Sequence, residues 1–105
     1  LNAFTGKLEL DNKSIKELCF LLSNEIDNLF MIVLSSSDEK VFISCFISKN
    51  LIAERNFNAS NIIKQLAPII DGSGGGQPFF ATGGGKNINA IDKALAESEK
   101  IISQL

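Results

Sequence analysis

The sequence predicts a single α/β domain, an α+β arrangement in which a small mixed β-sheet is packed by about three helices. Three observations support this fold class. Apolar residues recur at helical spacing in three segments, two uninterrupted apolar runs have the length of buried strands, and a glycine-rich stretch precedes the last helical segment. The composition, 45% hydrophobic and 21% charged, is that of an ordinary globular domain spanning residues 1–105.

The first two elements are predicted from alternation and from a helix-start pattern. Residues 3–10 alternate loosely between apolar and polar positions, and Gly6 favours an edge position for this strand. Ser14 followed three residues later by Glu17 matches a capping box, which predicts a helix over residues 14–27. The apolar face of that helix carries Ile15, Leu18, Cys19, Leu22 and Ile26.

The central strands are predicted from two apolar runs, residues 29–34 and 41–47, which the polar residues 35–40 join as a turn. Strands that are apolar on both faces are covered on both sides, so we expect these two to form a central hairpin. Residues 50–55 are expected to make a short helical turn.

Two further helices are predicted in the second half of the chain. Asn58 or Ser60 caps the first, Pro68 marks its kink or last turn, and Gly72 suits a left-handed position after its end. Asn89, with Asp92 three residues later, is expected to cap the last helix. The apolar stripes of the two helices are Ile62, Ile63, Leu66, Ile69 and Ile70, then Ile91, Leu95, Ser98, Ile102 and Leu105.

The stretch from Asp71 to Lys86 holds seven of the eight glycines in two clusters. Each ordered glycine costs roughly 0.5–1 kcal/mol relative to alanine, so their number indicates positive φ angles or close backbone approach. A flexible linker is the alternative, but Pro78 and the two adjacent phenylalanines favour an ordered loop folded onto the core. Asn87 after Lys86 excludes a Walker loop, and Gln77 at the third glycine position excludes a dinucleotide fingerprint.

The chemistry that the chain lacks excludes most enzyme classes for this segment. There is no histidine and no Cys-x-x-Cys pair, so neither a hydrolytic triad nor a zinc site is indicated. We expect the scattered carboxylates to be solvated, and Cys19 and Cys45 to be buried free thiols in a reducing cytoplasm rather than a disulfide. No apolar run or leader predicts a membrane span or secretion, and the start at Leu1 suggests a fragment of a longer chain.

The candidate binding residues are those that offer exposed backbone amides or positive charge. Successive glycine N–H groups can form a concavity for an anion. Lys86, Lys93 and Lys100 recur every seven residues, which predicts one helix face, either solvated or in contact with phosphate, with Lys86 as the first phosphate partner. Phe79 and Phe80 either pin the loop to the core or stack on unpaired bases. The candidates for a nucleic-acid site are Gly74, Gly75, Gly76, Gln77, Gly83, Gly84, Gly85, Lys86 and Lys93.

The segment GSGGGQPFFATGGGKN, with the amphipathic helix after it, resembles the glycine-rich signature of the DHH-associated domain in the version that closes alanyl-tRNA synthetases. The resemblance extends in order through Leu10-Asp11, residues 27–30, residues 47–51 and Asn58-Ala59, and so covers nearly the whole chain. It implies a non-catalytic C-terminal module that binds the outer corner of alanine tRNA, with the glycine loop and Lys86 facing the RNA. It also implies the rest of the synthetase as a partner, a homodimer in some members, and ATP, Mg²⁺ and zinc bound elsewhere in the parent enzyme.

Two alternatives to tRNA binding stay open. A dimerisation or protein-interaction module would use the apolar stripes and bind no phosphate. The substrate-binding lobe of a DHH-family phosphoesterase usually carries a histidine where this chain has Gln77, which disfavours that branch. The net charge of −2 argues against a broadly basic surface, so RNA contact is expected from a local patch.

Overall fold

A computed structural model describes all 105 residues as one five-stranded mixed sheet with helices on both faces. The strand order is β1-β2-β3-β5-β4; β1 runs parallel to β2, and the other neighbours are antiparallel. The strands are β1 (Asn2–Lys7), β2 (Leu29–Ser37), β3 (Lys40–Ile47), β4 (Gly72–Gly76) and β5 (Phe80–Gly85). The predicted α/β fold class is therefore confirmed, as is the edge position of the first strand.

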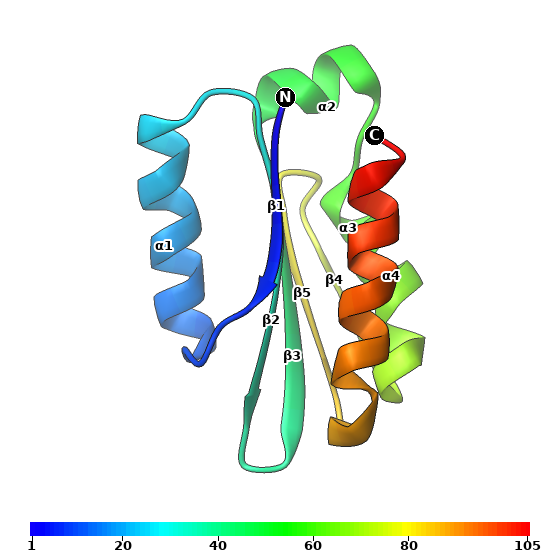
Figure 1. The fold of residues 1–105 in the computed structure, drawn as a ribbon. Helices are drawn as coiled ribbons and strands as arrows, with labels where there is room; N and C mark the ends of the chain where they lie inside the picture. Colours follow the sequence, from blue (N-terminus) through cyan, green and yellow to red (C-terminus); the bar gives the residue numbers. More distant parts are fainter.

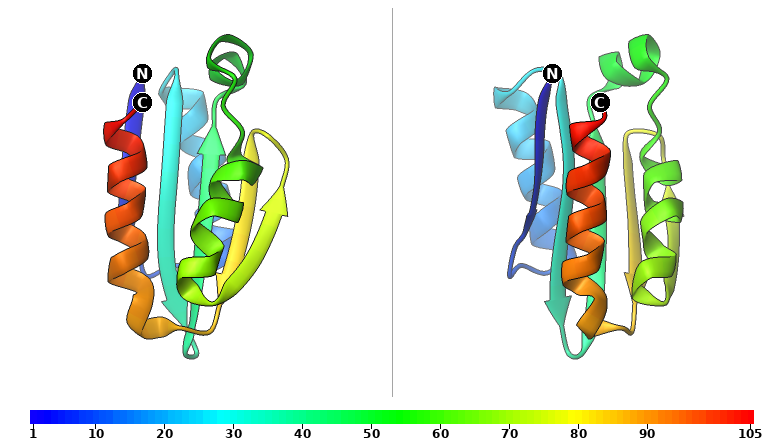
Figure 2. Two further views of the ribbon diagram at one scale, coloured as in Figure 1. Left: turned by 90° about the vertical axis from the view of Figure 1, so that its right-hand side faces the viewer. Right: turned by 45° about the vertical axis from the view of Figure 1, so that its right-hand side comes forward.

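Helix α1 covers one face of the sheet, and α3 and α4 cover the other (Figure 1). Figure 2 shows α3 and α4 side by side on their face, while α2 lies at one end of the sheet. The helices are α1 (Asn12–Glu25), α2 (Lys49–Arg55), α3 (Ala59–Leu66) and α4 (Ile91–Ser103), with 3₁₀ turns η1 (Ala67–Ile70) and η2 (Ile88–Ala90).

The two faces of the sheet carry two separate hydrophobic cores. Alternate residues of β2 point to opposite faces, so that Phe30 and Ile32 join the core under α3 and α4, while Met31 and Val33 join the core under α1. Because both faces are covered, residues 29–34 are buried without exception. The continuous apolar pattern therefore identified the central strands correctly.

The β2–β3 hairpin turns at only two residues, Asp38 and Glu39. Both have left-handed φ angles, 51° and 62°, which is the geometry of the two-residue turn that matches the twist of paired strands. The strands are consequently longer than predicted, because Ser35 to Ser37 continue β2 in register with β3.

The glycine-rich stretch forms a β-hairpin rather than a loop. The first cluster is β4 and the second belongs to β5, and the two strands pair with each other. Gly72 begins β4 instead of taking the left-handed position, which Asp71 occupies with a φ of 55° after η1. Asp and Asn tolerate this conformation better than most residues, and so the helix end required no glycine.

Two of the predicted helix starts are wrong, and one is right. Asn58 caps α3, as predicted, with its side-chain oxygen 2.9 Å from the backbone nitrogen of Ser60. Asn89 lies inside η2, so α4 begins at Ile91 without a side-chain cap. The cap of α1 is Asp11, not Ser14: the Ser14 backbone N–H donates to the Asp11 carboxylate at 2.7 Å.

The assignment of Asp11 as the cap of α1, in place of the predicted Ser14–Glu17 capping box, can be tested by mutation. We expect Asp11→Ala to lower the midpoint of thermal unfolding at pH 7. A capping box would need the side chain of Glu17, so Glu17→Ala should change the midpoint little if Asp11 is the cap. The hydrogen bonds from the Ser14 backbone and side chain lower the pKa of Asp11 below 3.8. The stabilisation is therefore present above about pH 4 and is lost as pH falls through the lowered folded-state value. Equal midpoints for Asp11→Ala and wild type at pH 7 would contradict the assignment.

Candidate functional site

The candidate glycines lie along the β4–β5 hairpin, at the outer part of the sheet. Gly74 is paired directly with Gly83, so the two clusters that are separated in sequence lie side by side. Gly76 and Gln77 lie at the turn of the hairpin, whereas Gly85 and Lys86 lie at its opposite end. The structure thus brings the two clusters together but separates Gln77 from Lys86.

The backbone of this hairpin does not form the concavity expected for successive glycines. An anion-binding concavity needs consecutive amides in alternating helical conformations. Residues 72–76 are instead extended and bonded to β5 on one side. Because β4 is the last strand of the sheet, its other side presents a free strand edge to solvent.

The candidate lysines are exposed, but they do not form one ridge. Lys86 follows β5 and precedes α4, where it lines a shallow hollow with Asp38, Glu39, Lys40 and Ile88. Lys93 lies in the first turn of α4. The predicted seven-residue spacing on a single helix face therefore holds for Lys93 and Lys100 only, because the chain between Lys86 and Ile91 is not α-helical.

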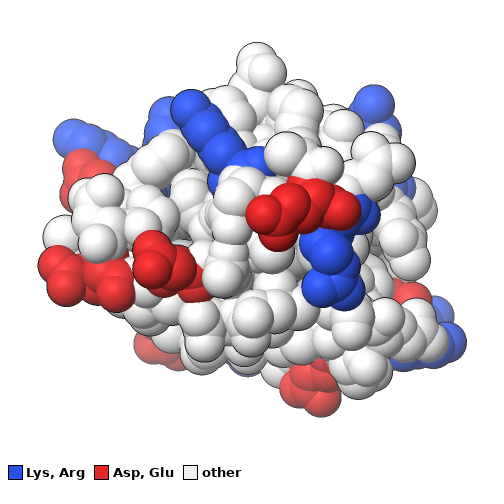
Figure 3. Space-filling view, turned by 90° about the horizontal axis from the view of Figure 1, so that it is seen from above, with Lys and Arg blue, Asp and Glu red and all other residues white.

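Charged side chains of both signs are interspersed on the end of the domain that carries α2 and both termini. Figure 3 shows this end with lysines and arginines next to acidic side chains and with wide uncharged areas between them. A single-signed basic surface is absent from this view, in keeping with the net charge of −2. Any phosphate contact at this end must come from individual lysine or arginine side chains.

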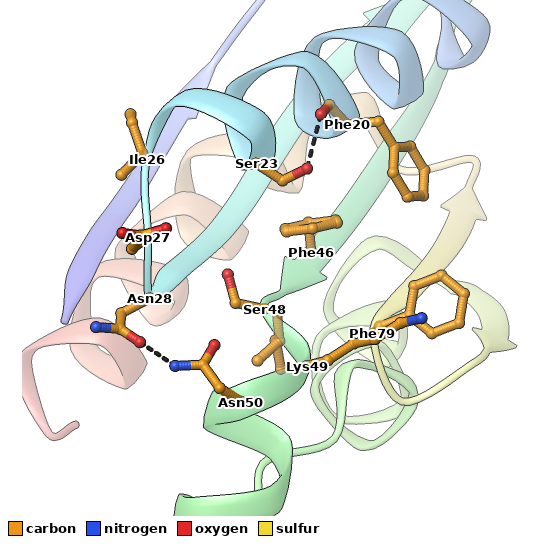
Figure 4. A pocket seen from close by; sticks show the side chains of 11 residues that line it. Phe20, Ser23, Ile26, Asp27, Asn28, Phe46, Ser48, Lys49, Asn50 and Phe79 are labelled. Carbon is orange, nitrogen blue, oxygen red and sulfur yellow. Dashed lines mark hydrogen bonds between the residues drawn. The ribbon is translucent and has the colours of Figure 1, made fainter.

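A pocket of 410 Å³ opens at the same end, between the end of α1, the start of α2 and the segment before β5 (Figure 4). Aromatic rings form one side of it, and polar side chains form the other. Its lining residues are Phe20, Ser23, Ile26, Asp27, Asn28, Phe46, Ile47, Ser48, Lys49, Asn50 and Phe79. The pocket combines an apolar wall with a few polar groups, as ligand sites generally do.

The aromatic side is built around Phe20 of α1. The ring of Phe20 is 5.4 Å from that of Phe46 and 6.4 Å from that of Phe79, centre to centre, in edge-to-face arrangements. It also packs on Phe80 at 5.7 Å. Phe80 belongs with the core under α1, so the prediction that these phenylalanines pin the segment is confirmed for Phe80. Phe79 remains half-buried at the pocket, with Lys49 Nζ 5.5 Å from its ring centre.

The polar side is held by hydrogen bonds across the start of α2. The amide nitrogen of Asn50 donates to the side-chain oxygen of Asn28, which has a left-handed backbone. The hydroxyl oxygen of Ser48 accepts from the Leu29 backbone N–H at 2.8 Å. Sequence reasoning missed this pocket because its walls come from separate elements and no local motif links them. Two signals were present in the sequence: Phe79 and Phe80 at the start of β5, and the family resemblance at residues 27–30 and 47–51, which contain six of the lining residues.

The two cysteines are buried free thiols, as predicted, and they belong to different cores. Burial raises the pKa of Cys19 to about 11 and raises that of Cys45 further. Because the thiolate is the reactive form, neither thiol is expected to react with a disulfide reagent at pH 8 while the domain is folded. Both should react on addition of denaturant. Rapid labelling of either thiol without denaturant would contradict the packing described here.

Two further properties bear on the classes of function. The acidic and cysteine side chains nowhere gather in a group of three or more that would hold a metal ion. Each helix is too short or too polar to traverse a lipid bilayer.

Comparison with known proteins gives matches over nearly the whole chain. Residues 2–104 match the DHHA1 domain. The chain is 43% identical over 102 residues to the alanine–tRNA ligase of Christiangramia forsetii, and 39% identical over 103 residues to that of Cytophaga hutchinsonii. Each alignment covers 97% of this chain but only 12% of the relative, so the chain spans a small part of the length of these curated relatives.

The fold is also similar to a solved structure, the crystal structure of the C-Ala domain from Aquifex aeolicus alanyl-tRNA synthetase. The TM-score is 0.81, and the match covers 96% of this chain and 90% of that chain. At 22% sequence identity, this likeness establishes the arrangement of the helices and strands.

Proposed function

The chain belongs to the DHHA1 domain family, and from this premise we propose that it is the non-catalytic, tRNA-binding C-terminal module of an alanine–tRNA ligase. The observation that carries the proposal is the 43% identity to the C. forsetii ligase across 97% of the chain. The ATP-dependent ligation of alanine to its tRNA, with its Mg²⁺ and zinc, is then the work of the remainder of the parent enzyme, in the cytoplasm.

In this role the module contacts the outer corner of alanine tRNA and helps the aminoacylation and editing parts of the enzyme to act on the same molecule. The absence of histidine and of a metal-holding cluster suits a domain that binds without catalysing. The parent synthetase and the tRNA are the partners that this role requires.

Phosphate contacts are proposed for Lys86 and Lys93, because both are exposed and lie at the same end of the α3–α4 side. The free edge of β4, with Gly74, Gly75 and Gly76, would offer backbone groups to the RNA, and Gln77 at the hairpin turn would offer its side chain. Gly83, Gly84 and Gly85 would support that edge through the β4–β5 pairing. Small residues allow a nucleic-acid backbone to approach closely.

Fluorescence anisotropy with labelled alanine tRNA, at about 50 and 200 mM salt, tests the proposal. Affinity should fall steeply with salt, with a log–log slope of roughly −0.7 to −0.9 for each phosphate neutralised. Lys86→Gln should make that slope shallower by about one such contact, whereas Lys13→Gln, on α1 across the sheet, should not.

The absence of tRNA binding at 50 mM salt would refute the tRNA-binding role of the 105-residue chain. If in that case its mass in solution rose with protein concentration, a dimerisation module would replace the proposal. Binding with equal loss in Lys86→Gln and Lys13→Gln would retain the role but remove Lys86 as a specific contact.

A further inference from the structure

We infer that the pocket between α1, β3, the start of α2 and the segment before β5 receives one unpaired nucleobase of the RNA, with the adjoining phosphate beside Lys49. This inference rests on the proposed tRNA binding, and it identifies a second contact that is separate from Lys86. The volume of 410 Å³ lies in the range of small-molecule sites, and a base with its ribose fits within it.

The aromatic wall supplies a stacking surface for the base. Phe46 is 5% exposed and forms the floor, while Phe20 and Phe79 are half-buried and reach the opening. The rings meet edge to face, so no two of them are stacked on each other. Base–aromatic stacking accepts every base because each has a π face, which suits a site with few polar groups.

Lys49 is placed to move from the ring to a phosphate. Its ammonium lies 5.5 Å from the centre of the Phe79 ring and is exposed at the rim (Figure 4). A cation over a ring at an exposed site is a weaker interaction than a base stacked on that ring. A base entering over Phe79 therefore replaces the ammonium, which remains within reach of the phosphate of the same nucleotide.

The opposite rim fixes the orientation of the nucleotide. Asp27 is exposed there, and its carboxylate repels phosphate, so the phosphate belongs on the Lys49 side. The Ser48 hydroxyl accepts from the Leu29 N–H, which leaves its proton for an acceptor on the base. Asn50 uses its amide nitrogen in the contact with Asn28, which leaves its oxygen for a donor on the base.

The chain offers a matched control for Lys49. Arg55, also in α2, lies 5.3 Å from the ring centre of Phe57, which packs on the other core. Lys49→Gln and Arg55→Gln thus each remove one positive charge over a phenylalanine, but only Lys49 lines the pocket. Phe79→Leu removes the ring while retaining apolar packing, and Phe79→Tyr restores a ring.

The experiment measures binding of the 105-residue chain to two fluorescein-labelled RNA hairpins, one with unpaired loop bases and one with abasic loop positions, and uses unlabelled alanine tRNA as competitor. Phe79→Leu should weaken binding to the first hairpin by at least about fivefold. Phe79→Tyr and Arg55→Gln should bind like wild type, and Lys49→Gln should bind more weakly with a shallower salt slope. The abasic hairpin should bind weakly to every variant. Thermal unfolding of each variant confirms that it is folded.

The outcomes separate this inference from the proposed function. If alanine tRNA binds and Phe79→Leu has wild-type affinity for both RNAs, the pocket assignment is overturned and the proposed function stands. If adenosine monophosphate alone displaces the hairpin as well as tRNA does, the ligand is a free nucleotide and the RNA assignment fails. If tRNA does not bind at 50 mM salt, the proposed function fails, and the inference that rests on it fails too.

Discussion

Gly85→Ala is expected to destabilise the domain by about 3 kcal/mol, at the upper end of the cost of overpacking. A Cβ at Gly85 would overlap the carbonyl oxygen of Ile70 and lie 2.8 Å from both the carbonyl carbon and the Cγ1 of that residue. The oxygen of Ile70 also accepts a hydrogen bond from the Asn87 N–H at 3.1 Å, so the backbone there is fixed from both sides. Relief would require η1 to separate from β5.

The neighbouring Gly84 is the control for this prediction. A Cβ at Gly84 would have Phe42 Cδ1 as its nearest neighbour, at 3.5 Å, which is ordinary van der Waals contact. Gly84→Ala should therefore change the free energy of unfolding by less than about 1 kcal/mol, and the reduced freedom of the unfolded chain favours stabilisation. Urea unfolding of the two variants decides the matter; equal stabilities would show that glycine is not required at Gly85 for close packing.

Phe30→Ala should lower the free energy of unfolding by about 3–5 kcal/mol, the usual cost of removing a buried phenylalanine. Phe30 is fully buried under α3 and α4, and its ring meets that of Phe57 edge to face at 5.4 Å. A domain of this size has a total stability of only about 5–15 kcal/mol, so this loss is a large fraction of the total.

Phe4→Ala is the matched substitution on the surface. Phe4 is 44% exposed on β1, and its loss should cost less than about 1 kcal/mol. Circular dichroism melts of Phe30→Ala and Phe4→Ala should differ by more than roughly 10 °C, given 4–8 °C for each kcal/mol in domains of about 100 residues. A difference of a few degrees would mean that the core under α3 and α4 is loosely packed.

The central hairpin could be predicted from sequence because burial on both faces leaves a continuous apolar run that no other element of this length produces. The glycine hairpin could not, because strands are recognised by alternating side chains and glycine has none. Close approach was one of the two reasons proposed for the glycines, and at Gly85 it is the one that applies. Because the first glycine cluster is the extended strand β4, its amides do not form the predicted anion-binding concavity.

Helix ends were harder to predict, because several polar residues near each start can serve as the cap. Only Ser14 was predicted as the cap of α1, and in the structure the backbone path makes Asp11 the cap instead. The lysine ridge was mispredicted for the same reason, an incorrect helix start. Residues 88–90 form a 3₁₀ turn and α4 begins only at Ile91, so Lys86 lies before the helix. The pocket required tertiary structure, because Phe20, Phe46 and Phe79 come from distant parts of the chain.

The unequal composition of the two outer strands has a consequence for aggregation. Both β1 and β4 expose a row of unpaired backbone groups, which can template a strand from another molecule. β4 consists of four glycines and Ser73, a composition with low β propensity and no side chains to interlock. β1 carries Phe4 and Thr5, which favour extended structure. Intermolecular sheet growth at high protein concentration should therefore begin at β1, while the glycine edge resists it.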